Sequence, residues 1–181
     1  MSFVQNGLVL MKIAILTVSD RGYRGEREDT AGPAIAEELA ELCPETIARD
    51  IVPDEPEMIA AKLRYYADEL GIDLAITTGG TGFSPRDVTP EATNSVIDRQ
   101  VPGIAEAMRH ESLKITPRAM LSRATSGIRK STLIINLPGS PKACRECLQT
   151  IKPALVHGVE VLGGNVDSCA RPDEHSHQGS S

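Results

Sequence analysis

The sequence predicts an α/β fold in which helices cover both faces of a parallel sheet. Short runs of β-branched and aliphatic residues alternate along the chain with amphipathic segments of helical spacing, the order expected of strand–helix–strand units. The length of 181 residues suits one domain, and 40% hydrophobic and 24% charged content is typical of a globular protein. Aromatic residues make up only 3%, so we expect an aliphatic core.

Several segments have the composition of strands. Residues 12–18 (KIAILTV) and 132–137 (TLIINL) are the strongest, because a continuous apolar run is typical of strands buried on both faces. Residues 72–76 form a third such run, bounded by turn residues. Residues 45–52 alternate less cleanly, and we expect an edge strand shortly after Arg123.

Helices are expected over residues 31–42, 56–70, 90 onward, 103–113 and 141–162. Three of them begin with a capping residue and an early proline, namely Thr30 with Pro33, Thr89 with Pro90, and Ser140 with Pro141. The last segment contains Pro153, which predicts a break in the helix near that residue.

The ends of the chain differ in character from its body. We expect residues 1–10 to be an N-terminal extension, residues 11–162 to form a single domain, and residues 163–181 to be a polar, disordered tail. The start lacks the features of a signal peptide, and no apolar run approaches the ~20 residues of a membrane span, so we expect a cytoplasmic protein. The net charge of −6 argues against binding to nucleic acid or to a membrane.

The most informative stretch reads IDLAITTGGTGFSPRDVTPEAT, residues 72–93. Gly79, Gly80 and Gly82 permit positive φ and let backbone N–H groups approach a ligand closely. A strand, a glycine turn and a helix start together favour an anion. A plain turn is the alternative, but it would need neither so many glycines nor the pair Arg86 and Asp87.

Loops that follow parallel strands lie on one edge of the sheet, where ligands bind in folds of this kind. Here these loops are residues 19–30, 53–55, 79–89 and 138–140. They carry four aspartates, Asp20, Asp29, Asp54 and Asp87. We therefore expect these carboxylates near one pocket that also contains two glycine turns and two helix N-termini.

This arrangement suits chemistry at phosphate. Carboxylates repel phosphate unless a divalent cation lies between them, and Mg²⁺ commonly binds one or two carboxylates together with substrate phosphates. Asp54 and Asp87 are the candidate ligands, so the pattern indicates phosphoryl or nucleotidyl transfer. The glycine spacing fits neither a Walker A loop nor a dinucleotide-binding fingerprint.

Plainer interpretations stand beside these. Asp54 suits an N-cap of the following helix, Asp87 suits a cap or a surface partner of Arg86, and Asp20 and Asp29 suit turns. Only the convergence of the four on one sheet edge favours a site.

Other reactive residues are interpreted structurally. Cys144 and Cys147 form a C-x-x-C within a predicted helix and are read as buried thiols rather than a redox or zinc site. His175 and His177 fall in the predicted tail. Arg123 stands in an irregular stretch from which it can approach an anion.

The string TTGGTGFSPRDVTPEAT closely resembles the signature of the molybdenum-cofactor biosynthesis family, the molybdopterin adenylyltransferases of the MogA/MoaB type, to which the gephyrin G domain belongs. Further segments resemble the same family, namely ILTVSDR near the start, IVPDE at 51–55, SLKITPRAMLSR at 112–123 and GIRKSTLIINLPGSPKAC at 127–144. The resemblance covers residues 11–162, nearly the whole body of the chain.

The resemblance implies a three-layer Rossmann-like sandwich with a mostly parallel central sheet, the molybdopterin-binding domain type. It implies an enzyme that transfers AMP from Mg-ATP to the terminal phosphate of molybdopterin and releases pyrophosphate. ATP and molybdopterin would be the substrates and Mg²⁺ the cofactor. The resemblance further implies a homotrimer, with hand-over of the product to a molybdate-insertion enzyme.

The family's two catalytic aspartates match Asp54 in VPDE and Asp87 in PRDVTP, which are also the expected Mg²⁺ ligands. The residues expected to bind nucleotide or molybdopterin are Ser19, Asp20, Asp29, Thr78, Gly79, Gly80, Thr81, Gly82, Arg86, Pro138, Gly139 and Ser140. Which loop takes which substrate stays open. The alternatives are a non-catalytic paralogue that binds or carries molybdopterin, and an enzyme acting on another nucleotide phosphate. The presence of both aspartates favours the adenylyltransferase over the carrier.

Overall fold

A six-stranded sheet with the order β4-β3-β5-β8-β7-β6 forms the centre of the computed structural model, which describes residues 4–5, 8–9, 11–43 and 46–164. The parallel strands are β3 (Ile13–Val18), β4 (Ala48–Val52), β5 (Leu74–Thr78) and β8 (Thr132–Leu137). Two short strands, β7 (Ser126–Arg129) and β6 (Arg99–Gln100), continue the sheet with antiparallel pairing. The prediction of a mostly parallel sheet is confirmed, and the antiparallel strands form one edge.

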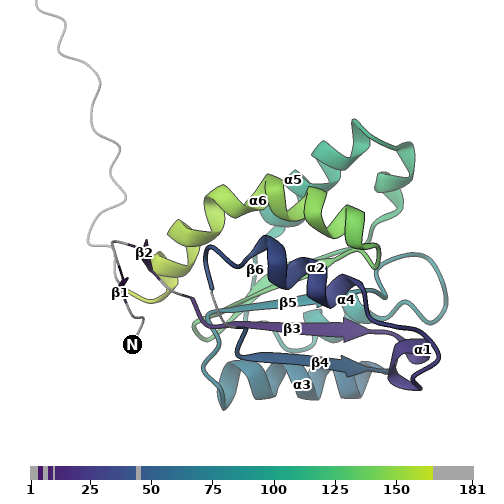
Figure 1. The fold of residues 1–181 in the computed structure, drawn as a ribbon, viewed down its shortest axis with the longest axis horizontal. Helices are drawn as coiled ribbons and strands as arrows, with labels where there is room; N and C mark the ends of the chain where they lie inside the picture. Colours follow the sequence, from purple (N-terminus) through teal and green to yellow (C-terminus); the bar gives the residue numbers. More distant parts are fainter. Residues whose placement is uncertain (1–3, 6–7, 10, 44–45, 165–181) are drawn as a thin grey trace, which may run out of the picture.

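Helices cover both faces of this sheet (Figure 1). One face is covered by α2 (Ala31–Glu38), α5 (Pro102–Leu113) and α6 (Pro141–Leu162), and the other by α3 (Pro56–Asp68) and α4 (Thr89–Asn94). Side chains alternate between the faces along each strand. Ile13 and Ile15 therefore join the first core, whereas Ala14 and Leu16 join the second. The aliphatic core predicted from composition is confirmed.

Short elements complete the chain. A turn of helix, α1 (Asp20–Tyr23), follows β3, and a 3₁₀-helix, η1 (Pro117–Leu121), follows α5. Strands β1 (Val4–Gln5) and β2 (Leu8–Val9) pair with each other within the predicted N-terminal extension. The predicted tail, residues 163–181, lies outside the described residues from residue 165 onward, as do His175 and His177.

The three predicted helix caps have different outcomes, since Thr30 stands at the N-cap position without a capping bond and the prediction for Thr89 is wrong. Thr30 precedes α2 but its side chain makes no capping bond, because Asp29 Oδ1 accepts from the N–H groups of Ala31 at 3.1 Å and Gly32 at 2.9 Å instead. Thr89 is the first residue of α4 and not its cap. Only Ser140 caps as predicted, accepting from Ala143 N at 3.2 Å.

The predicted break at Pro153 is also wrong, since α6 is one helix of 22 residues with this proline inside it. A proline within a helix removes one backbone hydrogen bond and costs about 3 kcal/mol. Packing offsets this cost, because Leu148, Ile151, Leu155 and Val159 lie at helical spacing on both sides of Pro153 and are all buried in the core.

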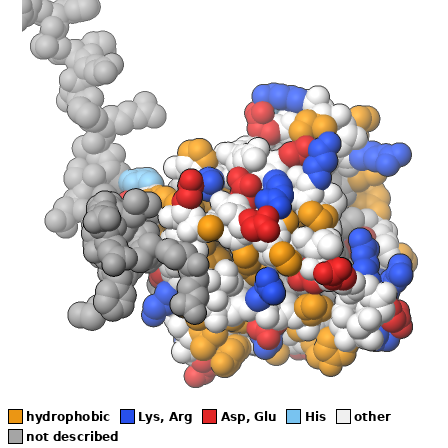
Figure 2. All heavy atoms as spheres, in the orientation of Figure 1, with side chains coloured by type: hydrophobic (Ala, Val, Ile, Leu, Met, Phe, Trp, Pro, Cys, Tyr) orange, Lys and Arg blue, Asp and Glu red, His pale blue; other side chains and the backbone are white. Residues whose placement is uncertain are grey.

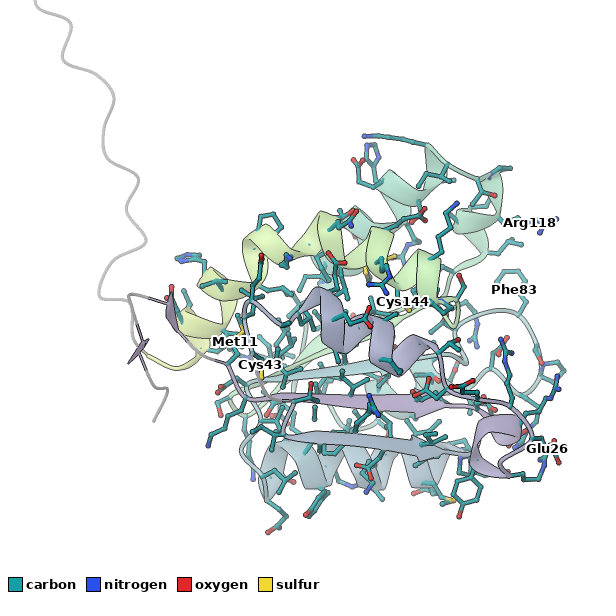
Figure 3. All side chains as sticks on the ribbon, viewed as in Figure 1. Met11, Glu26, Cys43, Phe83, Arg118 and Cys144 are labelled. Carbon is teal, nitrogen blue, oxygen red and sulfur yellow. The ribbon has the colours of Figure 1, made fainter. Side chains whose placement is uncertain are left out.

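The parallel strands β3, β4 and β5 point toward the end of the molecule where α1 lies (Figure 1). The loops named from the sequence are therefore gathered at one edge. In Figure 3, the labelled Glu26 and Phe83, from the loops after β3 and β5, both lie at this end. Acidic and basic side chains are interspersed over the face drawn in Figure 2. Among the described residues, no helix combines the length and apolar character needed to span a membrane.

Candidate active site

A strained glycine turn follows β5. Gly79 and Gly80 have φ of 95° and 63°, in the left-handed region that side chains disfavour. A Cβ on Gly79 would lie 2.4 Å from the carbonyl oxygen of Val18, and a Cβ on Gly80 would lie 2.3 Å from Thr89 Oγ1. Both positions therefore require glycine, because the turn is pressed against the end of β3 and the start of α4.

Thr89 holds this turn. Its hydroxyl donates to the carbonyl oxygen of Gly79 at 2.9 Å, and its N–H donates to that of Gly80 at 3.1 Å. These bonds tie the start of α4 to the glycine turn. The Gly79 N–H itself donates to the carbonyl oxygen of Leu137 at 3.3 Å, which ties the turn to the end of β8.

The loop of Pro138 to Ser140 lies directly beside the glycine turn, as the parallel topology predicts. Thr78 Oγ1 donates to the Pro138 carbonyl at 2.7 Å. A Cβ on Gly139 would meet the Cα of Gly79 at 3.4 Å. Two glycine-containing loops are thus in contact, and the bonded residues Thr78 and Pro138 are 60 positions apart in sequence.

An acidic cavity of about 240 Å³ opens in front of these loops. The predicted site residues that line it are Ser19, Asp29, Asp54, Thr78, Gly79, Gly80, Asp87 and Gly139. Arg27 and Glu28, which were not predicted, line it as well. Four carboxylates therefore surround a space in which Arg27 is the single basic side chain among the described lining residues.

Asp54 is tied to Asp20 and not to the helix that follows it. Asp54 Oδ2 accepts from Asp20 N at 2.8 Å, and Asp54 N donates to Asp20 Oδ1 at 3.1 Å. The N-cap position of α3 belongs to Glu55, so the capping interpretation of Asp54 is wrong. Burial raises the pKa of Asp54, and the charges of Asp20 and Asp87 add to this rise, which exceeds the lowering by the Asp20 N–H.

Asp87 closes the glycine loop on itself. Its Oδ2 accepts from Ser84 N at 2.8 Å, and its own N–H donates to Ser84 O at 2.8 Å. A Cβ on Gly82 would lie 2.9 Å from Asp87 Oδ2, so the carboxylate sits against the turn. Asp87 and Asp54 line the same cavity, and the charge of Asp87 contributes to the raised pKa of Asp54.

Arg86 does not pair with its sequence neighbour Asp87 but with the carboxylates of Asp20 and Glu55. Its guanidinium donates to both oxygens of Asp20, at 3.1 and 2.9 Å, and to Glu55 at 2.9 Å. These bonds lower the pKa of Asp20 and raise that of Arg86. Arg86 and Asp20 thus form a bridge at the rim, and neither is among the residues that line the acidic cavity.

Asp29 accepts hydrogen bonds from the start of α2 and also lines the acidic cavity. Its Oδ1 accepts the two N–H groups at the start of α2, and its Oδ2 accepts from Thr17 Oγ1 at 2.9 Å. The interpretation of Asp29 as a residue of local structure is therefore confirmed, although its side chain also borders the cavity.

A second, mainly apolar cavity of about 280 Å³ lies on the other side of the turn. Of the predicted residues, Thr81, Gly82 and Pro138 line this space and not the acidic one. The remaining lining comes mostly from α5, η1 and α6, including Met108, Leu121 and Cys147. The sequence did not predict this cavity, because its walls come from segments with no common motif.

Arg123 is a further residue whose contacts the sequence did not predict. Its Nε donates to the Gly82 carbonyl at 2.7 Å, and its two terminal nitrogens donate to the Asp87 carbonyl and to the Glu91 carboxylate. It was expected to approach an anion from an irregular stretch; instead, its guanidinium is bonded to the glycine loop.

The cysteines behave as predicted. Cys144 and Cys147 are buried, and Cys144, labelled in Figure 3, donates to the Pro138 carbonyl at 2.9 Å. Burial raises the pKa of the Cys144 thiol to about 11 and also raises that of Cys147. Neither thiol is poised for redox chemistry.

A metal ion would find oxygen donors here. The described residues contain no group of three or more His, Cys, Asp or Glu side chains arranged to hold a metal. Asp54 and Asp87 nonetheless border one cavity, and two carboxylates are enough for Mg²⁺ when a phosphate supplies further oxygens. The donor set therefore fits Mg²⁺ bound together with a phosphate substrate.

Comparison with known proteins gives one consistent result. Residues 14–157 match the family model described as "Probable molybdopterin binding domain". The chain is 48% identical over 155 residues to the molybdopterin adenylyltransferase of Helicobacter pylori strain J99, covering 84% of this chain and 88% of that protein. It is 43% identical over 155 residues to the molybdopterin adenylyltransferase of Escherichia coli K12, covering 82% and 80%.

Solved structures agree. The molybdopterin biosynthesis enzyme MoaB of Thermus thermophilus superposes with a TM-score of 0.81 at 53% identity, covering 86% of this chain and 98% of that one. A structure described as MogA superposes with a TM-score of 0.78 at 38% identity, covering 83% and 99%.

Proposed function

The chain belongs to the family of probable molybdopterin binding domains, and from this premise we propose how it works. It is a molybdopterin adenylyltransferase of molybdenum cofactor biosynthesis, as are relatives that are 43–48% identical to it over 155 residues. ATP and molybdopterin are its substrates. The terminal phosphate of molybdopterin attacks the α-phosphorus of ATP, pyrophosphate leaves, and adenylyl-molybdopterin remains.

The observation that carries the assignment of residues is the placement of Asp54 and Asp87 in the same cavity as the glycine turn. Four lining carboxylates against one arginine would repel a triphosphate. Mg²⁺ held by Asp54 and Asp87 would supply the neutralising charge at the reacting phosphates. Gly79 and Gly80 let the backbone approach those phosphates without steric hindrance from a Cβ.

The two cavities suit two substrates that must meet. Gly79 and Gly80 line the acidic cavity, whereas Thr81 and Gly82 line the apolar one. Phosphates bound at the turn would therefore lie between the two spaces. Catalysis would consist mainly of holding the reacting groups in position, because phosphate transfer demands little covalent chemistry of the protein.

The localisation, oligomeric state and partners are inferred from the family resemblance and the composition. We propose that the protein acts in the cytoplasm as a homotrimer and hands its product to a molybdate-insertion enzyme. The net charge of −6 is unfavourable for binding to nucleic acid or an anionic membrane, so small molecules and protein partners are the expected ligands.

The test mixes the protein with Mg-ATP and molybdopterin and follows pyrophosphate and an AMP-bearing pterin. We expect both products, in equal amounts, and neither when ATP or Mg²⁺ is left out. A protein that binds molybdopterin yet forms neither product would be the non-catalytic carrier. Formation of pyrophosphate without an adenylylated pterin would indicate a different nucleotide acceptor.

A further inference from the structure

Arg123 reaches the glycine loop from a distant part of the chain. It follows η1, and its side chain donates to the carbonyl oxygen of Gly82 at 2.7 Å and to the carbonyl oxygen of Asp87. It also forms an ion pair with Glu91 in the first turn of α4. Its own N–H donates to the Thr81 carbonyl at 2.9 Å.

These contacts join the two ends of the loop that carries Asp87. The loop begins at Gly82 and ends at Asp87. The planar guanidinium of Arg123 donates to the backbone carbonyl oxygens of both residues. An arginine side chain presents its donors in a rigid fork, so the two carbonyl groups are held at a set separation. The position of the Asp87 backbone therefore depends on Arg123.

Hydrogen bonds rather than packing hold the loop. Besides those of Arg123, they are the bonds of Asp87 with Ser84 and of Arg86 with Asp20 and Glu55. The four residues 83–86 between these anchors are all exposed, and the Phe83 side chain is 67% exposed. Figure 3 shows Phe83 at the outer end of the molecule. With no apolar side chain of this segment buried, hydrogen bonds must carry the ordering of the loop.

Arg123 also connects this loop to the second cavity. Its neighbours Ser122 and Ala124 line the apolar space, and Arg123 is only one-third exposed. The same residue thus ties the wall of one cavity to the backbone of Asp87, a residue that lines the other.

We propose that Arg123 is a positioning residue for adenylyl transfer, which fixes the Asp87 carboxylate at the reacting phosphates without touching a substrate itself. The proposal rests on the function proposed above. A displacement of about 1 Å of a catalytic group can lower a rate by a factor on the order of 100. Losing the guanidinium should therefore reduce kcat while leaving substrate binding largely intact.

The test compares Arg123→Gln and Arg123→Lys with Arg129→Gln. Arg129 is a matched control, because it too is partly buried and donates to a backbone carbonyl, that of Val96, and to a carboxylate, that of Asp68. We expect kcat of Arg123→Gln to fall about 100-fold with KM for ATP little changed. Arg123→Lys should regain part of the loss, and Arg129→Gln should keep the kcat of the wild type.

Amide hydrogen exchange of residues 82–91, followed by mass spectrometry, gives a readout that does not depend on turnover. Exchange in this peptide should quicken in Arg123→Gln and stay unchanged in Arg129→Gln. If it stays unchanged in both, Arg123 does not order the loop and the proposal is overturned. A faster exchange with an unaltered kcat overturns it too.

The two proposals fail in different ways. An inactive wild-type protein would remove the proposed function, whereas the exchange data would still decide whether Arg123 orders the loop. A rise in KM for ATP with unchanged kcat would make Arg123 a binding residue and would contradict the positioning role.

Discussion

Asp54 and Asp68 stand at opposite ends of the parallel strands and have opposite electrostatic surroundings. Asp68 ends α3 and is bonded to Arg129 at 2.6 Å and Lys130 at 2.9 Å, which lower its pKa to about 2. Asp54 follows β4 and forms no ion pair with any described residue, and burial raises its pKa. One carboxylate is neutralised by the protein, and the other is not.

The difference supports the proposal that one end of the sheet serves stability and the other serves chemistry. Carboxylates left buried and unpaired in a cavity oppose folding, and such groups gather where a ligand provides the missing charge. At the Asp54 end, the bonded cation Arg86 is used on Asp20 and Glu55 at the rim. Arg27 is the only basic side chain among the described residues that line the acidic cavity, so under the proposed function Mg²⁺ from solution would balance the remaining carboxylates.

The largest loss of turnover is expected for Asp87→Ala, at the end of the sheet that carries Asp54. Turnover should fall by a factor on the order of 100 to 1000, because a charge placed at the reacting phosphates is lost. Affinity for molybdopterin should change little. Pyrophosphate release and equilibrium binding of the pterin measure the two quantities, and a parallel loss of both would make Asp87 structural.

A paired comparison of Asp54→Asn with Asp68→Asn should separate the two ends of the sheet. Asp54→Asn should lower kcat about 100-fold without lowering Tm, since an amide oxygen still accepts from Asp20 N and a charge repulsion is removed. Asp68→Asn should lower Tm and leave kcat unchanged. Calorimetry measures Tm, and pyrophosphate release measures kcat. A loss of Tm in Asp54→Asn together with a loss of kcat in Asp68→Asn would contradict the assignment of the two ends.

The pH dependence of stability should follow Asp68. Its pKa in the folded protein is about 2, below the ordinary value of about 3.9. The stabilisation is thus complete above the ordinary pKa and is lost as pH falls through about 2. Between about pH 4 and pH 2, Tm of the wild type should drop more steeply than that of Asp68→Asn, which lacks the titrating group. Parallel curves would show that the pair with Arg129 adds nothing.

The smallest expected effect concerns the thiols beneath the Pro138 loop. Because burial raises the pKa of Cys144 to about 11, only about one molecule in a thousand carries its thiolate at pH 8. Alkylation of Cys144 and Cys147 should therefore be slow in the folded protein and fast after unfolding. Peptide mapping after timed iodoacetamide treatment measures this, and rapid labelling would show that the loop opens readily.

Features determined by local sequence were predictable. The bounds of β8 coincide with the apolar run 132–137, and Ser140 caps α6, because a buried strand and an N-cap depend on neighbouring residues. The approach of Asp54 to the glycine turn was also predictable, since parallel topology brings the strand ends together.

Features determined by distant partners were not predictable. Thr89 has the pattern of a cap, but Val88 occupies the N-cap position of α4, and the hydroxyl of Thr89 donates to the distant carbonyl of Gly79. Pro153 has the pattern of a helix break, but the core on both sides of it favours a continuous helix. The partners of Arg123 lie 32 to 41 residues away in sequence. No pattern in the residues around Arg123 indicates which groups it binds.

The bonds made by Arg123 have a consequence for protein design. A designer who transplanted residues 77–93 onto another strand–turn–helix unit would carry over the glycines, Asp87 and the start of the helix. The guanidinium that fixes Gly82 and Asp87 would stay behind, since it enters from the segment after η1. Residues 77–93 are therefore not sufficient on their own. A graft would also need the segment that carries Arg123, which is far away in sequence.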